Sequence, residues 1–261
     1  MQEGADLIDR SPAPAVTRAI ELLEFLAANP AGPVSLTDLA KGIGAARSST
    51  RNVCGALEAG GLIQRRDGGY QLGRRLVEFG GAYLASFDQI REFYRACAES
   101  PLLSRELVQV AILDGTDVLY VARHEGRAPL QLSARIGDRF PAALTAVGNA
   151  LLAPLSELEI HHRFSGTTAF EARTPRSVRN VEELIVQLAT VRDRGYAVDF
   201  GGVHPAVTGI SASVPEAGGS PRFAVGVSLI AARPSDEDLA RYGKAIQTVA
   251  AQIAPPSRRI A

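Results

Sequence analysis

The stretch SLTDLAKGIGAARSSTRNVCGALEAGGLIQRRDGGYQL, residues 35–72, decides the fold of the N-terminal part of this chain. Ser35 is typical of a helix N-cap, and Asp38 stands three positions later, as in a capping box. These two residues predict a short helix over residues 36–41. The Gly-Ile-Gly that follows interrupts this helix, because glycine disfavours its continuation.

A longer helix is predicted over residues 46–59, with Thr50 and Leu57 among the side chains that face inward. The glycine pair at 60–61 ends it as a C-terminal glycine cap. Two short strands, 62–65 and 70–72, then flank an Asp-Gly-Gly turn that is typical of a β-hairpin.

Upstream, apolar residues at three- and four-residue spacing predict a helix over residues 16–28. Helix, short helix, glycine turn, helix and two-stranded ribbon is the order of a winged helix-turn-helix. Short helices joined by glycine turns also occur in many other folds. The agreement of several independent local signals favours the DNA-binding interpretation.

The charges are distributed unevenly along the chain. Its 28 basic and 28 acidic residues give a formal net charge of zero, which taken alone argues against a nucleic-acid partner. Residues 10–75, however, hold nine basic and five acidic groups, so this segment carries +4 and the remainder −4. Lys41 and Lys244 are the only lysines, and arginine binds phosphate and guanine in a bidentate manner. A codon bias toward arginine would explain its abundance, but not this local surplus over acids.

The composition excludes several classes of protein. A hydrophobic content of 46% and a charged content of 21% are ordinary for a folded soluble protein. No apolar stretch approaches 18 residues, so we expect no membrane span, and the acidic residues 1–9 do not form a secretory signal. Cys54 and Cys97 are too few for a disulfide framework, which fits a reducing cytoplasm.

The rest of the chain predicts a helix followed by an α+β domain. An apolar stripe at helical spacing runs from residue 74 to about 90, and it either packs on its own domain or contributes to dimerisation. Beyond residue 93, strand pairs and helical runs predict an antiparallel sheet with helices packed on it. Strands are expected over 107–113, 118–123, 196–200, 208–214 and 222–230, and helices are expected to begin near Thr145, Ser156, Asn180 and Ser235.

Several segments carry a resemblance to a known family. The most specific are TAVGNALLA at 145–153 and VRDRGYAVD at 191–199, since no common structural need explains both behind a winged helix. The others are RAIELL at 18–23, LTDLA at 36–40, LEAGGLI at 57–63, YQLG at 70–73 and IG at 136–137. Over nearly its full length the chain resembles the IclR-type bacterial transcriptional regulators.

The resemblance implies three parts: a winged helix-turn-helix DNA-binding domain (10–75), a linker helix (76–92) and a GAF-like effector-binding domain (93–257). It implies a ligand-responsive repressor or activator of a catabolic operon, working in the cytoplasm as a homodimer or dimer of dimers. The expected partners are double-stranded operator DNA and a small-molecule effector. No membrane partner, cofactor or metal is expected.

The DNA contacts are expected at the start of the helix over 46–59 and on the hairpin. The first part of a recognition helix points into the major groove, where arginine suits guanine and asparagine suits adenine. Ser48 is equally well explained by the preference for serine at the start of a helix, where its hydroxyl can bind free backbone amides. The family often has histidine or tyrosine at Arg51 and arginine at Asn52, so its operator sequence is not transferable. The candidates are Arg47, Ser48, Ser49, Arg51 and Asn52 on the helix, and Arg65 and Arg66 at the wing.

The effector is expected near the helix that begins at residue 145, because free N–H groups at a helix start favour a carboxylate. This feature and the family tendency suggest a small organic acid, with aromatic acids among the candidates. The family frequently has lysine at Asn149 and a cysteine or other polar side chain at Gly209, so the pocket should differ in shape here. By resemblance the candidates are Ala146, Gly148, Asn149, Asp199, Gly209, Ser211 and Ser228. Gly148 could instead serve close helix packing, and Asp199 could be an exposed carboxylate at a strand end.

Two other classes of function fit the sequence less well. A catalytic C-terminal domain finds little support, because the four histidines lack metal-site spacing and Gly209–Ser213 lacks the second glycine of a nucleophile elbow. We therefore expect no catalytic residues. Alternatively, the winged helix could belong to a sensor that binds protein instead of DNA. Salt-dependent binding to promoter DNA would separate these alternatives.

Overall fold

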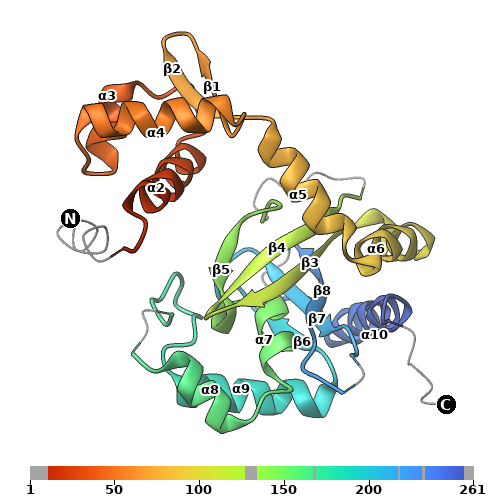
Figure 1. The fold of residues 1–261 in the computed structure, drawn as a ribbon. Helices are drawn as coiled ribbons and strands as arrows, with labels where there is room; N and C mark the ends of the chain where they lie inside the picture. Colours follow the sequence, from red (N-terminus) through yellow and green to blue (C-terminus); the bar gives the residue numbers. More distant parts are fainter. Residues whose placement is uncertain (1–10, 127–133, 167–168, 217, 231–232, 256–261) are drawn as a thin grey trace. The chain divides into compact units, whose positions relative to one another are not determined.

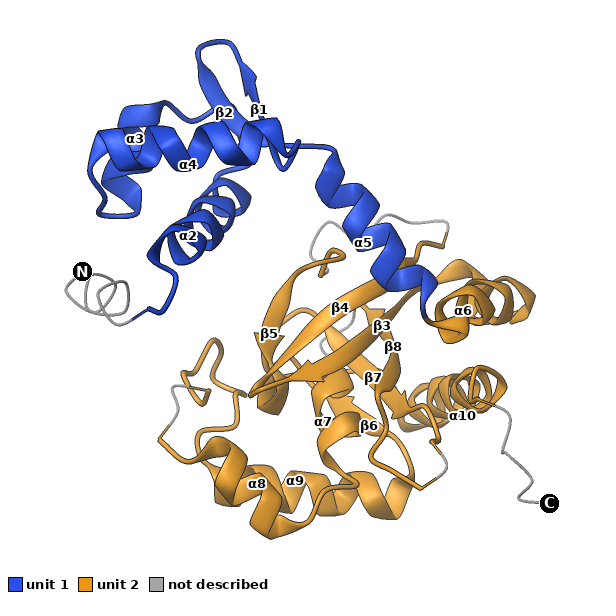
Figure 2. Cartoon of the chain, in the orientation of Figure 1, with its two compact units in different colours: residues 1–86 blue, residues 87–261 orange. Residues whose placement is uncertain are grey.

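The structure is a computed structural model that describes residues 11–126, 134–166, 169–216, 218–230 and 233–255. The chain divides into two compact units, Met1–Ser86 and Phe87–Ala261 (Figure 2). The acidic residues 1–9 and the predicted domain ends at 10 and 257 lie outside the described residues. Within the described residues, no helix is long and apolar enough to cross a membrane.

The first unit is a three-helix core with a β-hairpin. Leu22 and Leu26 of the first helix, Leu39 of the second and Cys54 of the third are buried together, so the predicted apolar stripes meet in one core. Cys54 is therefore a core residue, as a cysteine on an apolar helix face usually is. The elements are α2 (Pro14–Ala28), α3 (Leu36–Gly42), α4 (Arg47–Ala59), β1 (Ile63–Arg66), β2 (Gly69–Leu72) and α5 (Arg75–Ala85).

Local signals set the ends of these elements as predicted. The Ser35 side chain accepts a hydrogen bond from the Asp38 amide and caps α3. Gly61 takes a left-handed φ of 71° just after α4. In the hairpin, Arg66 pairs with Gly69, and the two turn residues Asp67 and Gly68 have φ values of 47° and 80°. Positive φ at both positions is the condition for a tight two-residue hairpin turn.

The single linker helix predicted from residue 74 to 90 is wrong, because two helices occupy this region. α5 ends at Ala85, and α6 (Asp88–Glu99) begins after Phe87, whose φ of −121° and ψ of 107° are extended. The Ser86 hydroxyl donates to the Tyr83 carbonyl, and so satisfies one of the free carbonyls at the end of α5. The apolar spacing continues across this break, which is why periodicity alone suggested one helix.

The second unit is built on a six-stranded antiparallel sheet with the order β5-β4-β3-β8-β7-β6 (Figure 1). All five expected strands are confirmed to within two residues at each end, but the short edge strand β5 was not predicted. The strands are β3 (Leu107–Asp114), β4 (Asp117–His124), β5 (Arg139–Pro141), β6 (Ala197–Asp199), β7 (Thr208–Ser213) and β8 (Phe223–Leu229).

Helices cover this sheet, and the central strand β8 is buried at six of its seven residues. All residues of α7 (Ala146–Leu152) are buried, and small side chains let this helix lie close to the strands. The expected helix starts are confirmed: Thr145, Ser156, Asn180 and Ser235 each cap a helix with their side chain. The other helices are α8 (Glu157–Phe164), α9 (Val181–Arg194) and α10 (Asp236–Gln252). The α+β class predicted from the sequence is thus confirmed.

Candidate functional site

One exposed face of α4 carries four of the predicted DNA contacts. Arg47, Ser48, Arg51 and Asn52 are all exposed, and three- and four-residue spacing places them on one side of the helix. Ala46 at the N-cap makes no side-chain hydrogen bond, so no cap blocks the first amides of the helix. Such free amides, beside two guanidinium groups, suit a phosphate group.

Ser49 and Thr50 have partners inside the unit. The Ser49 hydroxyl accepts a hydrogen bond of 2.9 Å from the Arg18 guanidinium on α2, which ties α2 to the start of α4. Thr50 is fully buried, and its hydroxyl donates to the Ala46 carbonyl at 3.1 Å. Thr50 is therefore part of the core, as predicted, and Ser49 is only partly available to another molecule.

The two wing arginines are also exposed. The Arg65 guanidinium lies 5.6 Å from the centre of the Tyr70 ring. Arg66 makes an ion pair of 3.6 Å with Asp67, but their side chains are 70% and 81% exposed. An exposed pair of this kind contributes little to stability, so Arg66 can exchange its partner for a phosphate at small cost.

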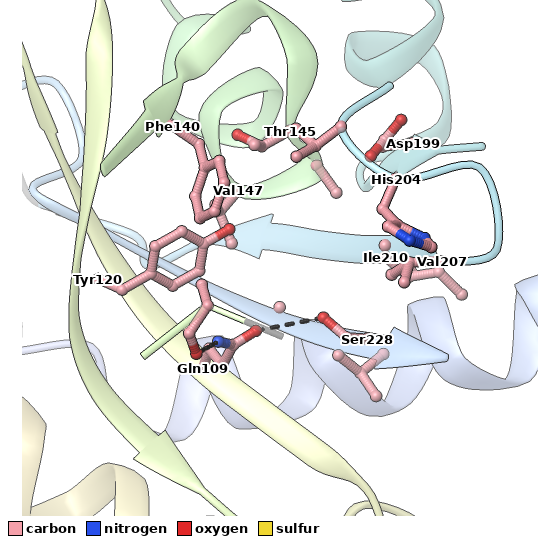
Figure 3. A pocket seen from close by; sticks show the side chains of 16 residues that line it. Gln109, Tyr120, Phe140, Thr145, Val147, Asp199, His204, Val207, Ile210 and Ser228 are labelled. Atoms are coloured by element: carbon pink, nitrogen blue, oxygen red, sulfur yellow. Dashed lines mark hydrogen bonds between the residues drawn. The ribbon is translucent and has the colours of Figure 1, made fainter. Parts of the chain in front are cut away.

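The second unit contains a cavity of about 590 Å³, counting its open mouth (Figure 3). The start of α7, the strand β7 and the loop after β6 all contribute to its wall. Of the predicted effector residues, it is lined by Ala146, Asp199, Gly209 and Ser228. Residues from four distant sequence segments therefore meet around one space.

The other three predicted residues lie beside this cavity but do not line it. The Ser211 hydroxyl donates to the Val225 carbonyl at 2.7 Å and is fully buried. A side chain on Gly148 would overlap the Ala142 backbone, so this glycine permits close helix packing. Asn149 is fully buried, and neither atom of its amide has a hydrogen-bond partner among the described residues.

Aromatic and polar residues that the sequence did not single out complete the cavity. Tyr120 on β4 and Phe140 on β5 form an aromatic wall, with ring centres 6.0 Å apart in an edge-to-face arrangement. Gln109 on β3 accepts a hydrogen bond of 3.2 Å from Ser228, which fixes both side chains at the cavity floor (Figure 3). In the sequence, the one sign that pointed to Gln109 was a polar glutamine within an otherwise apolar predicted strand.

Asp199 and His204 add titratable groups from the end of β6 and the loop after it. The Asp199 carboxylate accepts a hydrogen bond of 2.6 Å from the Gly202 amide. Burial nevertheless raises the pKa of Asp199 to about 7, against the lowering effect of amides at Gly201 and Gly202. The Ala206 amide donates to Nδ1 of His204 at 3.3 Å, so neutral His204 carries its proton on Nε2.

No lysine or arginine lines the cavity among the described residues. Its donors are Nε2 of His204, the hydroxyls of Tyr120 and Thr145, and the first amides of α7. Burial raises the pKa of Tyr120, and the charges of Asp199 and Asp138 add to this effect, so the phenol stays protonated at neutral pH. A small, partly aromatic molecule with a few oxygen atoms fits this lining. Within the described residues, no cluster of side chains could hold a metal ion.

A basic winged helix and a domain with an open cavity, joined in one chain, are the features of a transcriptional regulator with an effector domain. Comparison with known proteins agrees with this class. The family model "IclR helix-turn-helix domain" matches residues 15–67, and "Bacterial transcriptional regulator IclR C-terminal" matches residues 81–255. The chain belongs to the IclR family of bacterial transcriptional regulators, and these matches are to regulators, not enzymes.

Three relatives illustrate the match. The HTH-type transcriptional regulator XynR of Escherichia coli K12 is 28% identical over 234 residues, which cover 89% of this chain and 92% of XynR. The Thermotoga maritima IclR structure has a TM-score of 0.73 at 25% identity and covers 91% of this chain and 96% of its own. An IclR homolog of Microbacterium hydrocarbonoxydans, crystallised with 4-hydroxybenzoate, has a TM-score of 0.78 at 21% identity and covers 92% and 97%.

Proposed function

We propose that this IclR-family regulator binds operator DNA through α4 and the hairpin, and that a small organic acid in the cavity changes its DNA affinity. The observation that carries the proposal is the exposed face of α4 in a chain that also encloses the cavity. The regulated genes would form a catabolic operon, under repression or activation, in the cytoplasm where the DNA lies. The effector must bind one conformation better than the other for DNA affinity to change.

On the DNA side, Arg51 and Asn52 would read base edges in the major groove, and Arg47 and Ser48 would hold a phosphate at the helix start. Arg65 and Arg66 would meet the backbone or the minor groove beside the wing. Ser49 would act through Arg18, which it already binds.

On the effector side, the aromatic wall and the donors at the start of α7 support an aromatic carboxylic acid. A carboxylate entering beside ionised Asp199 would be repelled, whereas a protonated Asp199 could share its proton with the ligand. A pKa of about 7 leaves Asp199 partly protonated at neutral pH. The Microbacterium protein has the same fold, and its structure is a complex with 4-hydroxybenzoate, which is an aromatic carboxylic acid.

The predicted effector residues would then have different tasks. Asp199 and Ser228 would contact the ligand, while Ala146 and Gly209 would set the width of the cavity. Ser211 would support the wall through its hydrogen bond to the Val225 carbonyl, and Gly148 and Asn149 would support it through packing.

Two or more copies would act together. Val77 and Phe79 on α5 are 76% and 52% exposed, which is unusual for large apolar side chains in a helix of eleven residues. We propose that this surface joins two chains in a homodimer, and that two dimers can combine. A dimer would place two α4 helices on the two halves of an operator.

The effector proposal is tested by calorimetric titration with a panel of carboxylic acids, beginning with 4-hydroxybenzoate. In Gly209→Ala the new Cβ would lie 3.0 Å from the Ala146 Cβ, so the wall must shift and the acid that binds should bind about tenfold more weakly. Gly219→Ala is the matched control, since its Cβ would meet nothing within 4 Å. Absence of binding across the panel, or equal affinity for both variants, would count against the proposed site.

A further inference from the structure

The second unit also contains an arginine-rich groove that neither the family match nor the effector cavity explains. This arginine groove is a space of about 1050 Å³, counting its open side, between α9, β6 and the two loops that carry Arg176 and Arg233. Arg176, Arg194 and Arg233 all line it, together with Gln187, Thr190 and Tyr196. Three guanidinium groups and three neutral polar side chains therefore surround one open space.

Arg194 and Arg233 are each fixed to the wall by a ring contact that leaves their N–H donors available. The Arg194 guanidinium lies 5.4 Å from the centre of the Tyr196 ring, and that of Arg233 lies 5.9 Å from the centre of the Phe200 ring. A guanidinium over an aromatic ring keeps its N–H groups available for another partner. Arg176 is held at the same wall by a hydrogen bond of 3.0 Å that it donates to the Phe200 carbonyl.

Arg194 and Arg233 carry positive charge into the groove. Neither Arg194 nor Arg233 makes an ion pair with a carboxylate in the part of the chain that the structure describes. Among the residues that the structure describes, Asp199 is the one acid that lines the groove, against three arginines. This contrasts with the exposed arginines of α6 and α10, such as Arg95 and Arg241, which pair with neighbouring acids.

We propose that the arginine groove binds a small multivalent anion that carries a phosphate group or several carboxylates, at a site separate from the effector cavity. Guanidinium groups bind phosphate and carboxylate oxygens in pairs, and preorganised ones lose little side-chain entropy on binding. The regulator would then respond to two kinds of ligand. Asp199 lines both spaces, so it is left unchanged in the tests.

The test is calorimetry on the full chain with two probes at constant ionic strength, pyrophosphate and citrate. We expect one site per chain for at least one probe, and about tenfold weaker binding for Arg194→Gln and for Arg233→Gln. Arg179→Gln is the matched control, because Arg179 is exposed nearby in the sequence but does not line the groove. Its affinity should stay within about twofold of the wild type. Thermal melting checks that all variants remain folded.

Tighter binding of pyrophosphate identifies a phosphate-bearing anion as the ligand class, and tighter binding of citrate identifies a polycarboxylate. Two results would overturn the proposal: no binding of either probe to the wild type, or an equal loss in Arg179→Gln. A negative result here leaves the carboxylic acid in the effector cavity untouched, since that acid is measured with the Gly209→Ala variant.

Discussion

Arg51 is the residue on which sequence-specific DNA binding should depend most. It is exposed on α4, one turn into the helix, and makes no ion pair among the described residues. We predict that Arg51→Ala weakens binding to the promoter fragment beside its own gene by ~1–3 kcal/mol and relaxes base preference. Fluorescence anisotropy with matched and altered DNA fragments measures both effects.

Arg91→Ala serves as the control, because Arg91 is an exposed arginine on α6 that already pairs with Asp88. It should leave DNA affinity unchanged. Unchanged affinity in Arg51→Ala as well would remove Arg51 from the proposed contact.

Asp199 should make the folding stability of the protein depend on pH. Its folded-state pKa of about 7 lies above the usual aspartate value of 3.8, so the folded protein holds the proton more tightly than the unfolded chain. Stability should therefore fall as the pH rises from about 4 to 7, and the full cost, on the order of 1–4 kcal/mol, should remain above pH 7. Asp199→Asn removes this cost while its amide oxygen still accepts from Gly202. Urea unfolding should show the variant more stable than wild type at pH 8, with the difference shrinking toward pH 5.

The same substitution has a functional consequence. If a carboxylate effector shares a proton with Asp199, wild-type affinity should rise as the pH falls through 7, and Asp199→Asn should lose this dependence. Asp193→Asn, an exposed acid on α9, should behave like the wild type in both measurements. A stability gain in Asp199→Asn that is the same at pH 5 and pH 8 would contradict the assigned pKa.

Residues of the cavity differ in how far the sequence could predict them. Asp199 lies in a segment that carries the resemblance to the family, and the same resemblance suggested Gly209 and Ser228 on the strands that follow. Tyr120 and Phe140 meet only because β4 pairs with β5, and β5 has three residues with no alternation to recognise. His204 lies in a loop whose course depends on tertiary contacts, and no local pattern fixes it.

At the scale of elements, short-range chemistry was the reliable guide. Helix starts were predicted because a serine, threonine or asparagine and the amides it binds lie within three residues of one another. The break between α5 and α6 was not predicted, because the apolar residues keep their helical spacing across the turn and the sequence pattern therefore looks like one helix. Pairing order in the sheet joins β3 to β8, more than a hundred residues apart, and no local signal reports such a contact.

Gly55 in α4 provides a prediction in which stability and DNA affinity change in opposite directions. A Cβ at this position would meet nothing within 4 Å, so Gly55→Ala should stabilise the helix by about 0.5–1 kcal/mol. Gly55 follows Arg51 by one turn on the same exposed face, where the methyl group would approach the DNA. We therefore expect a higher urea midpoint together with weaker operator binding.

Gly42→Ala is the contrasting variant, because its methyl group would overlap the Phe25 ring and should destabilise the unit. If Gly55→Ala increased both stability and operator affinity, the proposed DNA-facing side of α4 would be wrong.

At the scale of the whole molecule, a net charge of zero conceals a local positive surplus. The basic segment 10–75 carries only +4, and a module of this charge needs at least two copies to hold DNA usefully. The compensating −4 comes from three acids in residues 1–9 and from Glu78, so residues 87–261 hold 19 basic and 19 acidic groups and carry no net charge. Within the second unit, arginines line the arginine groove, and among the described residues none lines the effector cavity. Charge is thus arranged by site, and the totals say little about function.

The central claim, that this regulator binds operator DNA through phosphate and base contacts, is tested most directly by a salt titration. The measurement is the affinity of the full chain for the promoter fragment beside its own gene, between about 50 and 200 mM salt. We predict specific binding whose logarithm falls steeply and linearly with the logarithm of salt concentration, as counterions are released from the DNA. No binding at low salt, or an affinity that does not change with salt, would contradict the claim.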